Sequence, residues 1–154
     1  MKWSVGNWFR HVLKNEQDRP VGIIRRRGGE YRFVSLENGG TLTVLRGDGA
    51  RVYRVIQGEA TTAAPMTLAS TEGLPPFIAP KAECVELAAN GERVRLRQLP
   101  KRDFAFAGQK TTGTIRGMLG RTAVIETNDP SEKDAALLYM LARMMLHEDD
   151  VDIL

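Results

Sequence analysis

The 154-residue chain is poor in the side chains on which many covalent and metal-dependent functions rely. It contains one cysteine, Cys84, and two histidines, His11 and His147. A single cysteine excludes an intramolecular disulfide and a multi-cysteine zinc cluster, and it fits a reducing cytoplasm. The two histidines lie near opposite ends of the chain, and neither has a second ligand at metal-binding spacing. The sequence therefore predicts no metal site and no cofactor, and each histidine is expected at a surface or an interface.

Long apolar runs are absent as well. The apolar block Ala135–Leu146 is interrupted by Arg143 and is shorter than the roughly 18 to 20 residues that span a bilayer. The first residues contain one early lysine but neither a long apolar segment nor a small-residue cleavage site, so we expect no signal peptide. The motifs of serine hydrolases, phosphate-binding loops and dinucleotide folds do not occur. These observations favour a protein that is not an enzyme and has no catalytic residues, although they do not exclude an enzyme.

What is present suits one globular domain. Apolar residues make up 42% of the chain and charged residues 27%, which is ordinary for a domain with a real core. The formal net charge is +3. This mild excess suits an anionic partner such as phospholipid headgroups or nucleic acid, but it also occurs in proteins that bind neither.

Most of the chain has the period-two pattern of β-strands, broken every eight to twelve residues by glycine-containing turns, which is typical of β-sandwiches and barrels. The proline-rich region 58–80 predicts a long loop or edge structure. About nine or ten strands are expected: Val21–Arg26, Glu30–Leu36, Thr41–Leu45, Arg51–Ile56, Met66–Ala69, Glu83–Ala89, Glu92–Gln98, Asp103–Ala107, Thr112–Arg116 and Thr122–Thr127.

The dipeptide Asn90-Gly91 gives the clearest hairpin signal. A two-residue turn would pair Ala89 with Glu92 and would place Glu86 opposite Arg95. One face of this hairpin then carries apolar residues and the other carries charges, as in a sheet with one solvated face. The apolar face comprises Val85, Leu87, Val94 and Leu96.

The first residues allow two interpretations. Trp8, Phe9, Val12 and Leu13 recur at helical spacing, which predicts a short amphipathic helix over residues 7–14. A strand that begins at Trp3 is the alternative. The expected organisation is a single domain with an N-terminal segment at 1–19, strands over 20–127, a central helix at 130–147 and an acidic tail at 148–154.

The helix near the end of the chain has strong sequence signals. Asp129 suits the N-cap, Pro130 the first helical position, and Glu132 the third position of a capping box. The residues that follow are apolar on every side of the helix except at Arg143, and such a helix must be buried on every side. A closed antiparallel β-barrel with the helix inside it offers those surroundings. The acidic residues after His147 oppose the helix dipole, so we expect the helix to end near His147.

The order of these elements resembles the tubby C-terminal-like superfamily, which includes tubby proteins, phospholipid scramblases and LURP-one-related proteins. The resemblance covers about residues 20–147. It is carried by the terminal stretch GTIRGMLGRTAVIETNDPSEKDAALLYMLARMML and by two upstream hairpins, TLTVLRGDGARVYRVI and CVELAANGERVRLRQL. The resemblance implies a twelve-stranded barrel around a central C-terminal helix. It also implies functions that differ within the superfamily, namely phosphoinositide binding, lipid scrambling and plant defence.

Two groups of residues are candidates for a binding surface. Basic residues that could bind phosphates are Arg25, Arg26, Arg27, Arg93, Arg95, Arg97, Lys101 and Arg102. The alternative is a solvated sheet face with cross-strand ion pairs such as Glu86–Arg95. Trp3, Trp8 and Phe9 lie among basic neighbours, which suits contact with a membrane or with a partner protein. The alternative is a segment that folds back and closes one end of the barrel.

Three functions follow from these candidates. The first is a barrel module that contacts an anionic membrane surface from the cytoplasm. The second is a protein-interaction scaffold that uses an exposed edge near residues 58–80. The third, nucleic-acid binding through the arginines of 93–97, is less favoured because few aromatic residues lie among them to stack on bases. The sequence predicts no oligomeric state.

Overall fold

The computed structural model describes residues 1–8, 11–46, 53–58, 66–67, 82–87 and 91–153. These residues form one twelve-stranded antiparallel sheet, one short 3-10 helix, η1 (Pro100–Arg102), and one α-helix, α1 (Glu132–Ile153). The strands are β1 (Lys2–Gly6), β2 (His11–Lys14), β3 (Pro20–Arg27), β4 (Glu30–Ser35), β5 (Thr41–Arg46), β6 (Tyr53–Gln57), β7 (Met66–Thr67), β8 (Ala82–Glu86), β9 (Arg93–Gln98), β10 (Phe104–Ala107), β11 (Thr112–Arg116) and β12 (Thr122–Thr127).

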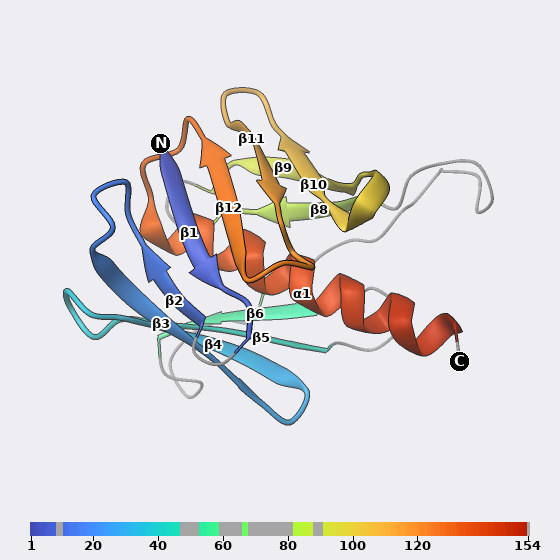
Figure 1. Ribbon diagram of the computed structural model, residues 1–154, viewed down its shortest axis with the longest axis horizontal. Helices are drawn as coiled ribbons and strands as arrows, with labels where there is room; N and C mark the ends of the chain where they lie inside the picture. Colours follow the sequence, from blue (N-terminus) through green and yellow to red (C-terminus); the bar gives the residue numbers. More distant parts are fainter. Residues whose placement is uncertain (9–10, 47–52, 59–65, 68–81, 88–90, 154) are drawn as a thin grey trace.

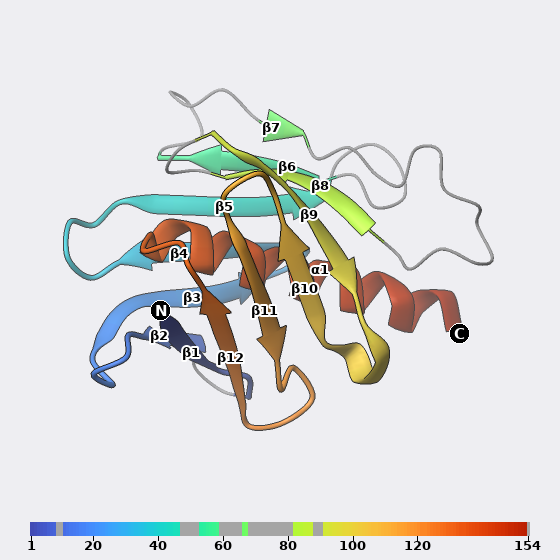
Figure 2. The ribbon, with the colours of Figure 1, turned by 90° about the horizontal axis from the view of Figure 1, so that it is seen from above.

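The sheet consists of two meanders joined by a single long-range pairing. Its strand order is β7-β6-β5-β4-β3-β2-β1-β12-β11-β10-β9-β8, so every neighbour is consecutive in sequence except the pair β1 and β12. Figures 1 and 2 show α1 running between β3 to β6 on one side and β1 with β8 to β12 on the other. The prediction of a mainly antiparallel β fold with a C-terminal helix is confirmed. No backbone ladder between the described residues joins β7 to β8, so closure into a barrel stays a prediction.

The helix is the centre of the hydrophobic core. Every residue from Ala135 to Leu146 except Arg143 is at most 5% exposed. The strands contribute alternate residues to the same core, as Val94 and Leu96 of β9 do between three exposed arginines. The expectation that α1 is buried on every side is therefore confirmed, and the strands curve around it because no flat sheet face could cover all of its sides.

The first residues form strands, so the alternative of a strand that begins near Trp3 is confirmed and the helix over residues 7–14 is wrong. Trp3 and Val5 of β1 and Leu13 of β2 are buried at period-two spacing. β1 lies between β2 and β12, so the predicted separate segment 1–19 is part of the sheet. Tertiary pairing outweighs the weak helical spacing here because the segment completes the link between the two meanders.

The β8–β9 hairpin has a longer connection than predicted. Val85 is opposite Val94 and Glu86 is opposite Arg93, a register two residues away from the expected one. The reason is a wider turn, in which the Leu87 N–H donates to the Glu92 carbonyl and the Gly91 N–H donates to the Leu87 carbonyl. Because the shift is even, the faces of the strands are preserved, and Val85 and Leu87 point inward as predicted.

Both ends of α1 differ from the prediction. The helix begins at Glu132, and Ser131 is its cap, since the Ser131 hydroxyl accepts from the Asp134 N–H at 3.3 Å. Asp129 instead accepts the Ser131 N–H at 2.9 Å in the preceding turn. The helix continues to Ile153 rather than ending near His147. The dipole penalty of acidic residues, about 1 kcal/mol or less, does not stop it.

We predict that Leu141→Asp unfolds the protein. Leu141 is fully buried, so the change removes core packing and inserts a charge, at a cost above about 4 kcal/mol. Met144→Asp should act in the same way. Leu119→Asp is the matched control, because Leu119 is 62% exposed. Urea and thermal unfolding measure the difference, and an unchanged melting transition in Leu141→Asp would contradict the buried-helix structure.

Glu92 joins the β8–β9 connection to the β10–β11 turn. Its carboxylate accepts hydrogen bonds from the Lys110 N–H at 2.6 Å, the Thr111 N–H at 3.1 Å and the Thr111 hydroxyl at 2.6 Å. These hydrogen bonds, led by the one from the Thr111 hydroxyl, lower the pKa of Glu92. The charged form therefore stabilises the folded state.

We predict that Glu92→Gln lowers stability at neutral pH and that the deficit shrinks in acid. A carboxylate whose pKa is lowered by folding contributes stability above its unfolded pKa, about 4.3, and loses it as the pH falls through the lower folded value. Urea midpoints of both proteins as a function of pH test this. A deficit that stays constant or grows on acidification would show that the ionised carboxylate is not the stabilising form.

Candidate functional site

Four connections gather at one end of the sheet, which we call the loop end: residues 7–8 after β1, Gly28-Gly29 between β3 and β4, residues 99–103 between β9 and β10, and residues 117–121 between β11 and β12. The antiparallel register requires this arrangement, since Gly6 pairs with Thr122, His11 with Ile24 and Phe104 with Ile115. Asp103 also accepts the Gly117 N–H at 3.2 Å, which connects two of these turns.

Two large apolar side chains are exposed at the loop end. Trp8 is 60% exposed and Leu119 is 62% exposed. The guanidinium carbon of Arg121 lies 5.5 Å from the centre of the Trp8 ring, a cation–π contact between the two loops. Core packing does not explain an exposed tryptophan in contact with a cation and an exposed leucine on the loop that leads to that cation.

Asn7 ties these two loops together. Its side-chain amide donates to the carbonyls of Gly117 and Gly120, each at 2.8 Å. Its backbone N–H donates to the Arg121 carbonyl at 2.8 Å. Gly117 has a φ of 78°, a conformation that favours glycine and turns the chain tightly toward Asn7. One residue therefore holds the loop that carries Trp8 against the loop that carries Leu119.

A polar network from α1 supports Asn7 from below. The Tyr139 hydroxyl donates to the Asn7 side-chain oxygen at 3.0 Å and accepts from Arg143 Nε at 3.1 Å. Arg143 Nη2 donates to the Met118 carbonyl at 2.9 Å. The one charged residue in the apolar stretch of the helix thus connects α1 to both exposed loops.

The sequence predicted each histidine at a surface or an interface. Both are half-buried, His11 against Tyr139 of this network and His147 against Tyr31. His11 Nδ1 lies 2.7 Å from the Gly6 carbonyl and 3.1 Å from the Tyr139 hydroxyl. The carbonyl can only accept, so Nδ1 carries the hydrogen in the neutral ring. His147 Nε2 lies 2.9 Å from the Tyr31 hydroxyl, and the Tyr31 ring is 6.3 Å from that of His11.

Burial controls the ionisation of these groups. Burial lowers the pKa of His11, and the nearby Arg143 and Arg26 lower it further, while the hydrogen bond to Gly6 acts in the opposite direction. Burial likewise raises the pKa of Tyr31 and of Tyr139. At neutral pH the network therefore holds a neutral imidazole and two protonated phenols beside two arginines.

The basic residues predicted at Arg25, Arg26 and Arg27 end β3 at the loop end, and all three are exposed. Arg25 is directly opposite Arg32 of β4, an unfavourable cross-strand pair of like charges. The Arg26 guanidinium lies 6.0 Å from the centre of the Tyr31 ring. Lys101 and Arg102 also lie at this end, in the turn between β9 and β10.

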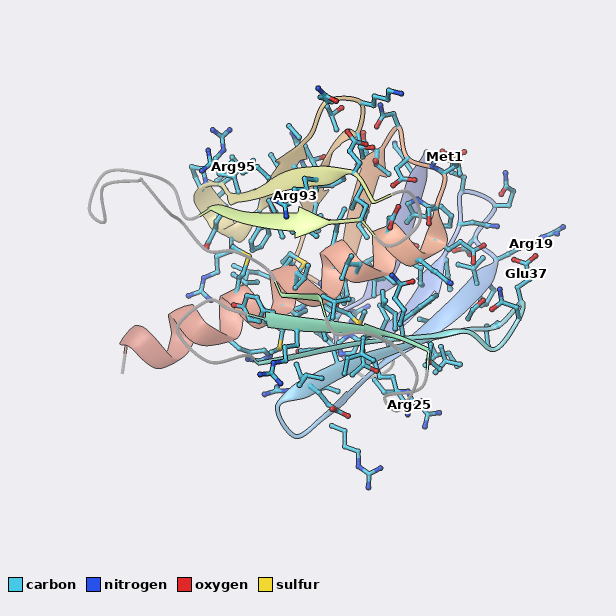
Figure 3. The ribbon with its side chains drawn as sticks, turned by 180° about the vertical axis from the view of Figure 1, so that it is seen from behind. Met1, Arg19, Arg25, Glu37, Arg93 and Arg95 are labelled. Carbon is cyan, nitrogen blue, oxygen red and sulfur yellow. The ribbon has the colours of Figure 1, made fainter. Side chains whose placement is uncertain are left out.

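The other predicted arginines are separate from this group. Arg93, Arg95 and Arg97 are exposed on β9. Figure 3 shows Arg93 and Arg95 on one side of α1 and Arg25 on the other. The direct neighbours of Arg95 are Cys84 and Ala107, and those of Arg97 are Ala82 and Ala105. The expected direct pair of Glu86 with Arg95 does not form in this register, and the two arginine groups do not surround one concavity.

The three aromatic residues predicted to contact a membrane or a partner have different outcomes. Trp8 is exposed, as expected for a contact residue. Trp3 is only 3% exposed, so its predicted role in a surface contact is wrong, because it faces the core from β1. Phe9 lies outside the described residues.

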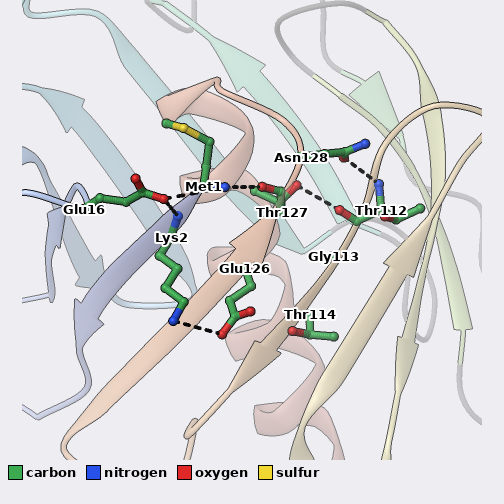
Figure 4. Close-up of a pocket in the computed structure, with 9 residues that line it drawn as sticks. All are labelled: Met1, Lys2, Glu16, Thr112, Gly113, Thr114, Glu126, Thr127 and Asn128. Atoms are coloured by element: carbon green, nitrogen blue, oxygen red, sulfur yellow. Dashed lines mark hydrogen bonds and ion pairs between the residues drawn. The ribbon is translucent and has the colours of Figure 1, made fainter.

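A groove of about 470 Å³ opens at the other end of the sheet (Figure 4). Its charges are satisfied within the chain. The Met1 ammonium donates to the Thr127 carbonyl at 2.8 Å and lies 3.6 Å from Glu16, and Lys2 lies 3.6 Å from Glu126. We therefore take the loop end, and not this groove, as the candidate site.

No helix among the described residues is long and apolar enough to cross a membrane. In the same part of the chain, no three histidine, cysteine or acidic residues come together as metal ligands would. Comparisons with protein-family models, curated proteins and solved structures find no match.

Sequence reasoning missed Asn7, Tyr139, Arg143 and Leu119. Two signals could have indicated the last three of these. Arg143 interrupts an apolar helix, and Tyr139 lies four residues before it on the same helical face, so the two were placed to interact. Leu119 stands between glycines in a turn, where a large apolar residue has no strand to fill.

We predict that Tyr139→Phe costs about 1–3 kcal/mol, because it removes only the hydroxyl and leaves Asn7 and Arg143 without that partner. Arg143→Met should be destabilising too, and the double variant should cost less than the sum of the two. Urea unfolding of the four proteins gives the coupling energy. Additive losses would mean that the hydroxyl and the guanidinium do not act together.

Proposed function

We propose that the protein binds anionic phospholipid surfaces through the loop end, as a non-enzymatic peripheral membrane module. The observation that carries the proposal is the exposure of Trp8 and Leu119 on two loops that Asn7 holds together, with Arg121 against the Trp8 ring. The indole of tryptophan suits the boundary between headgroups and acyl chains, where its ring is apolar and its N–H is solvated. Leucine on the adjacent loop adds apolar area that can be buried in the same layer.

Basic residues around this pair add electrostatic attraction. Arg25, Arg26, Arg27, Lys101 and Arg102 lie at the same end. Each basic residue near an anionic surface contributes about 1 kcal/mol, and the attraction falls with salt. The whole chain carries a formal net charge of only +3, so we expect a modest affinity that depends strongly on ionic strength.

The rigid support of the loops favours a binding role. Asn7 holds both loops through three hydrogen bonds, so little conformational entropy is lost when Trp8 and Leu119 are buried against a surface. A membrane fits this geometry better than a narrow partner groove does, because the side chains come from two loops and are surrounded by dispersed positive charge.

We also propose that the chain has the tubby C-terminal-like fold. Twelve strands around a buried C-terminal helix agree with what a tubby C-terminal-like protein would have, and closure across β7 and β8 is the part that we propose. A scaffold role with no lipid contact remains the alternative, since exposed apolar loops also suit a protein partner. Nucleic acid is not favoured, because the direct strand neighbours of Arg95 and Arg97 include no aromatic residue.

We predict that the protein co-sediments with vesicles that contain phosphatidylglycerol and not with vesicles of phosphatidylcholine alone. Trp8→Ala or Leu119→Ala should weaken binding about tenfold each, since each removes an apolar side chain from the contact. Arg121→Gln should weaken it less and should reduce its salt dependence.

Leu36→Ala is the control, because Leu36 is 52% exposed but lies at the opposite end of the sheet, after β4. The melting transition of each variant shows that it is folded. Equal and low binding to both kinds of vesicle, or equal losses in Leu36→Ala and Trp8→Ala, would contradict the proposal.

A further inference from the structure

A cluster of cations and phenols lies between α1 and strands β2 to β4. His11 comes from β2, Arg26 from β3 and Arg143 from α1. Tyr31 and Tyr139 are their shared neighbours: the Arg26 guanidinium lies 6.0 Å from the Tyr31 ring and that of Arg143 lies 5.5 Å from the Tyr139 ring. The His11 ring is 6.3 Å from the Tyr31 ring and 5.9 Å from the Tyr139 ring, and both arginines act electrostatically on it.

The charges of this cluster are unbalanced among the described residues. Among the described residues, the groups that shift the pKa of His11 are the Gly6 carbonyl, Arg143 and Arg26, and none of these is a carboxylate. Tyr31 faces it from β4 and Tyr139 from α1, both as neutral phenols at physiological pH, and Asn7 beside Tyr139 is neutral as well. His147 lies beyond Tyr31 and makes its hydrogen bond to the Tyr31 hydroxyl. Protonation of His11 would thus add a third cation with no described anion to balance it.

We infer that His11, Arg26 and Arg143 form a phosphate-binding site whose affinity is coupled to the protonation of His11. The ligand class is a phosphodiester, as in an anionic phospholipid headgroup. The inference rests on the proposed function for the source of that phosphate, but the chemistry of the site does not depend on it.

The geometry leaves donors for such a ligand. All three side chains are exposed or half-buried. The hydrogen bonds of Arg143 to Tyr139 and Met118 use two of the five N–H donors of its guanidinium. In neutral His11 the hydrogen on Nδ1 is directed to the Gly6 carbonyl, so protonation adds its hydrogen at Nε2. A phosphate oxygen can accept that new hydrogen while the arginines bind the other oxygens.

The direction of the pH effect follows from linkage. Without an anion, folding lowers the pKa of His11, so protonation costs more free energy in the folded protein than in the unfolded chain, and the folded state loses stability as the pH falls below about 6.5. A bound phosphate offsets that cost and raises the pKa of His11. By reciprocity, acid strengthens phosphate binding, up to about tenfold for each unit by which the ligand raises the pKa.

The first experiment measures binding to phosphatidylglycerol vesicles at about pH 7.5 and about pH 5.5, where the charge of this lipid does not change and histidine titrates. We expect the wild-type protein to bind several-fold more tightly at the lower pH, up to the roughly tenfold that a pKa rise of one unit allows. His11→Asn should lose the increase, because asparagine does not titrate in this range while its amide can still donate to the Gly6 carbonyl. His147→Gln is the matched control and should retain the increase.

The second experiment follows the His11 ring by NMR titration, with the protein alone, with the vesicles, and with glycerophosphoglycerol, the soluble headgroup of the same lipid. A higher pKa with both ligands identifies the phosphodiester itself as the ligand, and a higher pKa with vesicles alone identifies the membrane surface. An unchanged pKa with both ligands overturns the inference. So does an equal pH dependence in His11→Asn and the wild type, even if the vesicles bind. If vesicles fail to bind at either pH, the proposed function is wrong, and the soluble headgroup still decides whether the site exists.

Discussion

The burial of one helix on all of its sides is the constraint on which the rest of the structure depends. A sheet that covered a single face of α1 would leave leucines and methionines in water, at about 1.5–3 kcal/mol for each large side chain. The strands therefore surround the helix, and the pairing of β1 with β12 joins the two meanders that do so. The close packing of core side chains against neighbouring strands requires glycine at two positions. A side chain at Gly22 would overlap the Phe33 ring, and one at Gly113 would overlap the Phe106 ring.

Arg143, which interrupts the apolar stretch of α1, connects this core to the surface. Arg143 is the one charged residue within the apolar stretch from Ala135 to Leu146, and its hydrogen bonds lead through Tyr139 and Met118 to the loops that hold Trp8 and Leu119. Desolvating a guanidinium is unfavourable unless its donors are paired, so the network is built around it. The packing of the helix and the display of the exposed side chains are thus parts of one arrangement.

Much of the fold could be predicted from local patterns. Period-two alternation located β3 to β5 and β9 to β12 to within about two residues, and the apolar helix identified the core. Local sequence patterns gave the wrong structure where tertiary contacts determine it. Trp3 enters the core because β1 pairs with β2, which follows it in the chain, and with β12, which is far away in sequence. The wide turn before Glu92 depends on hydrogen bonds that the dipeptide Asn90-Gly91 does not reveal.

The candidate site was harder to predict, because its members come from separate elements. Arg25 to Arg27 and Trp8 were recognised as residue types, but the sequence does not show that they share one end of the sheet. His11 and His147 are 136 positions apart in the chain, yet Tyr31 and Tyr139 bring both into one cluster. Such convergence follows from the strand register, which a single sequence does not specify beyond its hairpins.

The most direct test uses fluorine NMR of protein labelled with fluorotryptophan, since the chain contains only two tryptophans. The account predicts that a dissolved paramagnetic agent broadens the Trp8 signal and spares that of Trp3, which is 3% exposed. Vesicles with phosphatidylglycerol should then protect Trp8 from the agent. A Trp8 signal that is protected without vesicles, or one that stays fully accessible when they are present, would contradict the account.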